Sequence, residues 1–348
     1  MERRAARGSL GSVCGGVLNR VDIWRGPAIE SVHRVHVAVV DGQGRLRASS
    51  GDPSFVTYAR SAIKPIQAMP LVEDGVVSGF GMDGRELALC CASHSGERHH
   101  IETVTAMLQR IGVDENALAC GPHEPFDAPS AQALRAAGRE PGRIHNNCSG
   151  KHTGMIALAC HHGWPVAGYE RLQHPVQQRI RREVARWTGI DADEGMTAID
   201  GCGVATFALP VESMARAFAR IAAEARQAGT PAAAVIDAMA SHPDYVAGTN
   251  RLCTLVSRAT DGRIVAKTGA EGVYCAAVPG AELGIALKVE DGAKRAAEPA
   301  LLAVLNALTL LSDDAMAGLA TFAEPFIMNT CGQRVGVIRA AIRLEPRN

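Results

Sequence analysis

The stretch SAIKPIQ, residues 61–67, opens a predicted helix over residues 61–74 and carries a serine and a lysine three positions apart. At that spacing Ser61 and Lys64 share one face of a helix and lie within reach of a hydrogen bond. A lysine amine that burial or a second cation keeps neutral can take the proton of a serine hydroxyl. The backbone N–H of Ser61 is also one of the unsatisfied first-turn donors, which can stabilise an oxyanion. Because an S-x-x-K pattern also arises by chance, the stretch predicts a nucleophile only together with other motifs.

A second lysine motif, KTG at residues 267–269, ends a predicted strand late in the chain. An S-x-x-K motif together with K-T-G is typical of serine β-lactamases and penicillin-binding proteins. The S-D-N triplet of those proteins is missing, and residues 91–97 (CASHSGE) take its place. Ser93 in this stretch would form a second pair with Lys267. The alternative is that Ser93 caps the amphipathic helix predicted over residues 98–111, although Ser95 stands nearer to its start.

Lysine is scarce in this chain, since only five of its 36 basic residues are lysine. Guanidinium stays protonated in proteins, whereas a buried lysine amine can lose its proton and act as a base. Lys64, Lys151 and Lys267 lie among small polar residues, which indicates that arginine cannot replace lysine there. Lys288 and Lys294 lie in an ordinary charged stretch, where an arginine-rich composition from a GC-rich genome is explanation enough.

Two polar runs suggest a metal site. The run HNNCSGKH, residues 145–152, and the run DGCG, residues 200–203, each contain a cysteine with glycine and polar neighbours. Two cysteines, an aspartate and a histidine can hold a zinc ion tetrahedrally. No C-x-x-C pair is present, so the spacing leaves open the alternative that the two cysteines only pack within their loops.

The composition is that of an ordinary globular protein, with 47% apolar and 21% charged residues. The net charge is zero, which gives no electrostatic case for a nucleic-acid or anionic-membrane partner. The apolar runs are shorter than the ~20 residues of a membrane span, and no apolar stretch of a secretion signal follows the N-terminal arginines. Ten cysteines, two of them adjacent, fit reduced thiols rather than a disulfide framework. We therefore expect a cytoplasmic protein.

The predicted elements change from strands to helices and back along the chain. Strands are predicted over residues 12–24, 33–48, 263–268, 272–278, 283–290 and 334–342. Further helices are predicted over residues 149–162, 175–189, 210–227, 231–240, 248–258, 293–311 and 314–321. This order predicts an α/β (α+β) fold, in which N- and C-terminal strands join one mainly antiparallel sheet flanked by helices. We expect a flexible arm over residues 1–9 and a single catalytic domain over residues 10–348, with a helical insert over about 70–260.

At these motifs the chain resembles the Rhizobium etli-type L-asparaginases, which form the asparaginase II family. The resemblance spans roughly residues 12–345, and four runs appear in order with family-like spacing: residues 60–67, 92–97, 147–152 and 200–203. It implies a fold similar to that of serine β-lactamases and glutaminases. It also implies an amidohydrolase that converts L-asparagine to L-aspartate and ammonia.

The resemblance further implies the residues of the site. Its two Ser–Lys pairs map onto Ser61 with Lys64 and onto Ser93 with Lys267. One zinc ion per chain, which aids substrate binding without being strictly required, would have ligands that map onto Cys148, Lys151, Asp200 and Cys202. The resemblance also implies a homodimer. We add Arg60, Glu97 and His152 as the residues expected to bind the amino-acid head group, and we take Ser61 as the attacking serine, with Ser93 as the alternative.

Two other functions are open at this point. The first is a glutaminase or another hydrolase of small amides or esters, because the depth of the substrate pocket is invisible in sequence. The second is a non-catalytic zinc-binding protein that reuses the fold. The two intact Ser–Lys pairs argue against the second.

Overall fold

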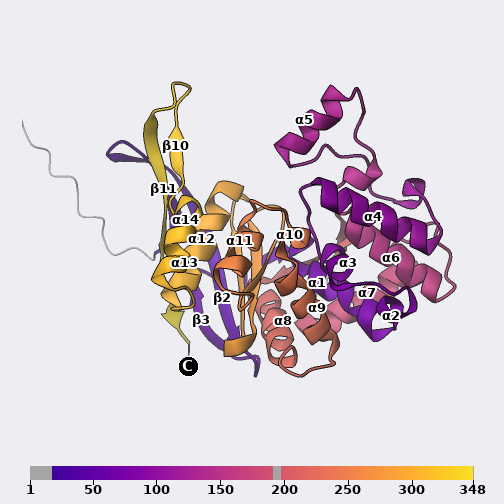
Figure 1. Cartoon of the computed structure of the whole chain (residues 1–348). Helices are drawn as coiled ribbons and strands as arrows, with labels where there is room; N and C mark the ends of the chain where they lie inside the picture. The colour runs from indigo at the N-terminus through magenta and orange to yellow at the C-terminus, as the bar shows by residue number, and fades with distance from the viewer. Residues whose placement is uncertain (1–17, 191–196, 348) are drawn as a thin grey trace, which may run out of the picture.

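The computed structural model describes residues 18–190 and 197–347. The predicted arm over residues 1–9 and the beginning of the first predicted strand lie outside the described residues. A sheet with helices packed on it occupies one side of the molecule, and a mainly helical region occupies the other (Figure 1). This arrangement confirms the predicted α+β fold with a helical insert.

An antiparallel sheet joins the two ends of the chain. Within the described residues it has nine strands, in the order β10-β11-β1-β2-β9-β8-β7, with β3 paired to β2 and β12 paired to β3. The first strand pairs directly with the penultimate one, as Asn19 lies opposite Ile342 and Arg25 opposite Gly336. The strand bounds are β1 Asn19–Arg25, β2 Ala28–Asp41, β3 Leu46–Ser50, β7 Val265–Thr268, β8 Val273–Val278, β9 Leu283–Val289, β10 Phe326–Met328, β11 Arg334–Ile342 and β12 Glu345–Pro346.

Helices cover both faces of this sheet because its strands are apolar on both sides. Along β2, Val37 and Val39 belong to the core beneath α12 (Lys294–Ala307), whereas Ala38 and Val40 belong to the core beneath α8 (Val211–Glu224). Alternate residues of a strand point to opposite faces, so one continuous apolar run can serve two cores. The remaining C-terminal helices are α13 Asp313–Gly318 and α14 Ala320–Ala323.

The helical region lies between β3 and β7 in the sequence. Its helices are α1 Lys64–Glu73, α2 Val76–Gly79, α3 Gly84–Cys90, α4 Arg98–Ile111, α5 Ala128–Ala136, α6 Ser149–His161, α7 Pro175–Thr188, α9 Pro231–Ser241, α10 Pro243–Val246 and α11 Leu252–Ala259. Short 3-10 turns lie at η1 Arg60–Ile63, η2 Glu115–Ala117 and η3 Arg143–His145, with a further one, η4, at Pro279–Ala281. A small sheet, β4 Val56–Tyr58, β6 Ala205–Pro210 and β5 Thr197–Ile199, was not predicted.

Two predicted helices differ in detail from the structure. The helix predicted over 61–74 is a 3-10 turn over residues 60–63 followed by α1, because Pro65 occupies the second position of α1 and Arg60 has a left-handed backbone with φ of 50°. The helix predicted over 248–258 begins only at Leu252, because Gly248 has φ of 140°, which a helix cannot contain.

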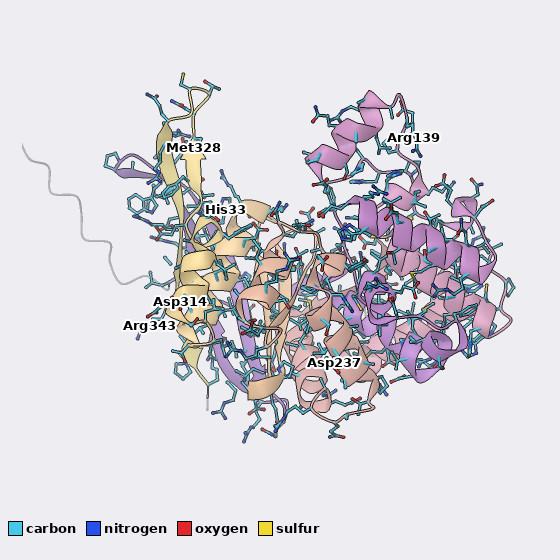
Figure 2. The ribbon with its side chains drawn as sticks, viewed as in Figure 1. His33, Arg139, Asp237, Asp314, Met328 and Arg343 are labelled. Atoms are coloured by element: carbon cyan, nitrogen blue, oxygen red, sulfur yellow. The ribbon has the colours of Figure 1, made fainter. Side chains whose placement is uncertain are left out.

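The charged surface is spread over the whole molecule, as expected for a chain without net charge. Arg139, Asp237, Asp314 and Arg343 are all exposed and point outward from four different elements or loops (Figure 2). Within the described ranges, no helix combines the length and the apolarity needed to cross a membrane.

Candidate active site

Ser93 lies between two buried lysine amines. Its Oγ is 3.0 Å from Lys64 Nζ and 3.0 Å from Lys267 Nζ. Each amine also donates to a backbone carbonyl, Lys64 to that of Ala92 at 2.5 Å and Lys267 to that of Thr268 at 2.7 Å. Both lysines are at most 1% exposed. The predicted pairing of Ser93 with Lys267 is therefore present in the structure.

The segment that carries Ser93 is held from two sides. After α3 the chain leaves the helix, and the N–H of Ser93 donates to the carbonyl of Val246 while the N–H of His94 donates to the carbonyl of Asn147. These bonds bring the loops before α6 and after α10 against residues 91–97. The sequence holds no signal for them, because each joins residues more than fifty positions apart.

Ser61 occupies the partly exposed wall of the same site. It lies in η1, and the end of β7 packs so closely against this turn that a Cβ on Gly269 would lie 3.0 Å from the carbonyl of Ala59. Within the described residues the hydroxyl of Ser61 has no hydrogen bond, and Lys64 reaches Ser93 and Cys148 instead. The structure thus places Ser61 at the site without the direct Ser61–Lys64 hydrogen bond that its spacing suggests.

Arg60 fixes the position of Ser61. A left-handed backbone at a non-glycine residue costs about 1 kcal/mol or more and needs support from its surroundings. Two contacts supply it: the N–H of Arg60 donates to Thr206 Oγ1 at 3.2 Å, and its Nε donates to Asp200 Oδ1 at 2.6 Å. Sequence reasoning missed Thr206, since nothing in its neighbourhood on β6 indicates a role at η1.

The surroundings of Lys267 favour the neutral form of its amine. Burial, followed by the charge of Lys64, lowers the pKa of Lys267 to about 7. An amine in that range can accept a proton near neutral pH, which an exposed lysine cannot do.

A second cluster of polar side chains contacts the serine–lysine cluster through the sulfur atom of Cys148. Lys64 Nζ lies 3.0 Å from Cys148 Sγ, and Lys151 Nζ lies 3.0 Å from Cys202 Sγ. The hydrogen bond from the Cys148 thiol, together with the charge of Lys151, lowers the pKa of Cys202 to about 4. The same hydrogen bond, with burial, raises the pKa of Cys148 to about 12. Cys202 is therefore a thiolate paired with the ammonium of Lys151.

Asp200 completes this cluster at its outer side. Its Oδ2 lies 4.0 Å from Cys202 Sγ. Burial opposes ionisation, but the charge of Lys151 and the hydrogen bond from Arg60 lower the pKa of Asp200. One thiolate, one carboxylate and one ammonium thus share a largely enclosed space.

The donor set fits a zinc ion in its chemistry. Ligands of tetrahedral zinc at Zn–N and Zn–S distances of about 2.0–2.3 Å stand roughly 3.3–3.8 Å from one another. The distances of 3.0 and 4.0 Å around Cys202 bracket that range. In the described chain, no three His, Cys, Asp or Glu side chains form a metal-binding group by themselves. The resemblance implies that Lys151 is a further donor, and its ammonium would have to lose a proton when the ion binds, because a protonated amine has no lone pair to give.

The family model for L-asparaginase II matches residues 21–340, which is most of the chain. The chain belongs to the L-asparaginase II family. Membership of this family supports an amidohydrolase, an enzyme that cleaves a carboxamide. No curated protein sequence matches the chain.

Solved structures are similar to this L-asparaginase II chain only at a distance. The structure of Mglu in its native form at 4.3 M NaCl has 16% identity and a TM-score of 0.36, and the match covers 80% of this chain and 61% of that one. A beta-lactamase from Mycobacterium bovis has 17% identity and a TM-score of 0.39, with coverage of 83% and 95%. The octameric penicillin-binding protein homologue from Pyrococcus abyssi has 12% identity and a TM-score of 0.34, with coverage of 86% and 80%.

The three residues predicted to bind the amino-acid head group lie around the site and differ in the hydrogen bonds that they already make. Glu97 is engaged by Thr249, whose N–H and hydroxyl donate to its two oxygens at 2.7 and 2.6 Å. Arg60 is paired with Asp200, as described above. His152 is fully buried, and its Nδ1 lies 2.6 Å from the hydroxyl of Tyr169, which itself accepts from the N–H of Ala119. Its Nε2 has no hydrogen-bond partner among the described residues.

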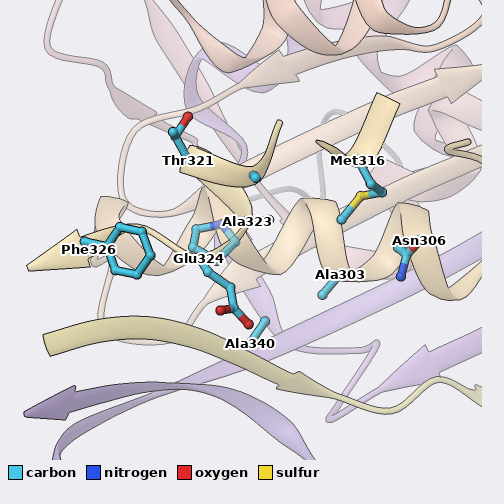
Figure 3. Close-up of a pocket in the computed structure, with 10 residues that line it drawn as sticks. Ala303, Asn306, Met316, Thr321, Ala323, Glu324, Phe326 and Ala340 are labelled. Atoms are coloured by element: carbon cyan, nitrogen blue, oxygen red, sulfur yellow. The ribbon is translucent and has the colours of Figure 1, made fainter. Parts of the chain in front are cut away.

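A separate pocket of about 470 Å³ lies far from this chemistry. It is formed by α12, α13, α14, β10 and β11, and its side chains include Met316, Phe326 and Glu324 (Figure 3). Among the described residues that line it there is no lysine, serine or cysteine. The serine–lysine cluster is therefore the stronger candidate for the active site of this L-asparaginase II chain.

Proposed function

We propose that the chain is a Rhizobium etli-type L-asparaginase, which hydrolyses L-asparagine to L-aspartate and ammonia. The observation that carries the proposal is the hydroxyl of Ser93 held 3.0 Å from two buried amines, one of which belongs to Lys64, three residues after the partly exposed Ser61. Membership of the L-asparaginase II family supports the choice of a carboxamide substrate. We extend the proposal to a homodimer in the cytoplasm.

In the proposed mechanism the hydroxyl of Ser61 attacks the side-chain carbonyl of L-asparagine. Ser61 is the serine that substrate can reach, because Ser93 is buried and both neighbouring amines already bond to its oxygen. The N–H of Ser61 and a neighbouring donor bind the developing oxyanion. The N–H of Ser61 lies in the first turn of η1, where intrahelical partners are missing.

Protons move along the chain of groups behind Ser61. Lys64 accepts the proton of Ser61, and the hydroxyl of Ser93 connects Lys64 to Lys267. One of the two amines must be neutral for this relay to accept a proton, and the lowered pKa of Lys267 supplies it. The relay returns a proton to the departing ammonia. Water then enters, gives up a proton to the same relay and releases aspartate.

We further propose that Cys148, Lys151, Asp200 and Cys202 hold one zinc ion. When bound, the zinc would supply positive charge that favours substrate binding and orientation. Lys64 contacts both Cys148 and Ser93, so it links the proposed ligands to the proposed relay.

The direct test is ammonia release from L-asparagine and from L-glutamine by the purified full-length chain. We expect turnover of L-asparagine, with a kcat/KM above that for L-glutamine. Turnover of L-glutamine alone would make the chain a glutaminase of the same chemistry. Zinc binding without ammonia release from either would identify the non-catalytic alternative.

The same assay tests the metal. Removal of zinc by a chelator should raise KM by about 10-fold while leaving kcat measurable, since an ion that only helps to bind and orient the substrate contributes roughly 1.4 kcal/mol for each tenfold in affinity. Cys202→Ser should lose the zinc found by elemental analysis, whereas the exposed Cys331→Ser should retain it. A Cys202→Ser protein with full zinc content would rule out this ligand set.

The pH dependence follows from the lowered pKa of Lys267. Below about pH 7 the amine of Lys267 is charged and the relay cannot accept the proton of Ser61, whereas above it that amine is neutral. We therefore expect kcat/KM to rise between pH 6 and 8 through one inflection near 7. The profile should be measured at constant ionic strength. A flat profile over this range would show that neither amine titrates during turnover.

A further inference from the structure

The head group of an amino-acid amide needs a cation for its α-carboxylate, and most cations of the site already have partners. Lys64 and Lys267 bond to Ser93 and to backbone carbonyls. Lys151 is paired with the thiolate of Cys202, and Arg60 with the carboxylate of Asp200. A carboxylate arriving at the site would have to displace one of these partners or find another cation.

Arg251 is a cation at the site whose guanidinium has no carboxylate partner among residues 18–190 and 197–347. Its hydrogen bond among the described residues runs from Nη1 to Ser95 Oγ, at 3.4 Å, which is long for such a bond. No ion pair of Arg251 occurs in the described part of the chain. Glu298 on α12 is within electrostatic reach, but burial raises its pKa and it hydrogen-bonds Tyr274 instead. Arg251 thus keeps most of its five donors free for a ligand.

The loop that carries Arg251 is built onto the segment of Ser93. Gly248 fits so closely between Ser95 and Glu97 that a Cβ there would lie 2.5 Å from Ser95 Oγ and 2.5 Å from Glu97 Oε1. Thr249 bonds to Glu97 through both its N–H and its hydroxyl. These contacts at Gly248 and Thr249 seat the loop on residues 95–97, and the hydrogen bond to Ser95 places the guanidinium of Arg251 beside the same segment.

Arg251 also lies at a position where its positive charge does not stabilise the fold. It is the N-cap of α11, and its side chain makes no capping hydrogen bond there. A cation at the positive end of a helix is unfavourable by a few tenths of a kcal/mol or more. By contrast Arg258, at the other end of α11, is exposed and lies at the end that favours cations. A half-buried arginine in an unfavourable position and without an ion pair indicates a role in ligand binding.

We propose that Arg251 determines specificity by binding the α-carboxylate of the amino-acid amide substrate. The proposal rests on the proposed function and deepens it: the substrate class becomes amides that carry a free α-carboxylate. Its planar fork can bind both carboxylate oxygens, which lysine cannot do. The ring of Phe126, whose centroid lies 6.0 Å from the guanidinium carbon, borders the position from the other side. Glu97, near the same loop, then remains available for the α-ammonium group.

The test compares Arg251→Gln with Arg251→Lys and with the matched surface control Arg258→Gln, all as full-length zinc-loaded enzyme. Two substrates are used: L-asparagine, and β-alaninamide, which is L-asparagine with its α-carboxylate replaced by hydrogen. Arg251→Gln should raise KM for L-asparagine by at least about 30-fold with kcat within a few-fold, as expected for loss of one partner of a charge pair. It should leave kcat/KM for β-alaninamide unchanged within about 2-fold. Arg251→Lys should lie between wild type and Arg251→Gln, and Arg258→Gln should match wild type.

Two results would overturn the proposal: an unchanged KM for L-asparagine in Arg251→Gln, or an equal loss of kcat/KM on both substrates, which would mean that the variant only disturbs the site. Binding of L-aspartate by calorimetry gives a measurement independent of turnover. Wild type should bind it and Arg251→Gln should not; equal binding, or none by wild type, overturns the proposal. If wild type releases ammonia from neither substrate, the proposed function fails, and this binding comparison alone then decides the role of Arg251.

Discussion

Ser61→Ala is expected to reduce kcat/KM for L-asparagine by at least about 10³-fold, because the variant lacks the hydroxyl that forms the acyl-enzyme. The protein should stay folded. Ser61 is only partly buried, and within the described residues its hydroxyl makes no hydrogen bond that the fold would miss. The measurement is ammonia release, accompanied by circular dichroism and the midpoint of thermal unfolding. Ser78→Ala is a matched control, since Ser78 is exposed and its hydroxyl bonds only to the carbonyl of Gly75.

Ser93→Ala is the informative companion, because it separates attack from proton relay. Loss of Ser93 breaks the link between Lys64 and Lys267 but leaves the proposed nucleophile in place. Acid-quenched mixtures of wild type with L-asparagine should contain an aspartyl adduct on Ser61, detected by mass spectrometry; Ser93→Ala should form the same adduct more slowly, and Ser61→Ala should form none. A fully active Ser61→Ala enzyme, or an adduct found on Ser93 itself, would move the nucleophile to Ser93.

The parts of the fold that depend on local pattern could be predicted from sequence. The helix over residues 98–111 is found as predicted, because its apolar residues repeat with helical spacing. The C-terminal strand was found at Arg334–Ile342, as its alternating apolar residues predicted. The beginning of α11 was predicted wrongly, although Gly248 was a visible signal for a break in the helix.

The sequence predicts which residues lie at the candidate site better than it predicts which of them contact one another. Motif order brought Ser93 and Lys267 into one prediction, and the structure holds them 3.0 Å apart. Sequence spacing paired Lys64 with Ser61, but the long side chain of Lys64 turns to Ala92, Ser93 and Cys148. Those partners stand 28 to 84 positions away, so only tertiary packing decides among them. Arg251 was missed for the same reason, because its position depends on a loop that docks onto a distant segment.

The second large effect is expected for Lys267→Met, which should lose activity by about 10³-fold and at the same time stabilise the protein. Removal of Lys267 leaves the relay behind Ser61 without the amine of lowered pKa, so the effect on kcat should approach that of removing the nucleophile. Methionine has similar length and no charge to bury. Because Lys267 is fully buried, its replacement should raise the midpoint of thermal unfolding by about 2–4 °C, the shift expected for roughly 1 kcal/mol in a domain of this kind.

The pH dependence of that stabilisation tests whether folding lowers the pKa of Lys267. Burial and the charge of Lys64 lower the folded-state pKa to about 7, whereas the amine of the unfolded chain titrates near its ordinary value of about 10.4. Below pH 7 both states carry the proton and the folded state bears the full cost of a buried charge. Between pH 7 and about 10 only the unfolded state binds the proton, so wild-type stability rises with pH relative to the variant. The gain from Lys267→Met should thus be largest at pH 6 and shrink by pH 9; Lys294→Met, on the exposed start of α12, should show no such trend. A gain that stays constant or grows with pH would mean that the folded-state pKa of Lys267 is not lowered, and the relay would then lack its neutral amine.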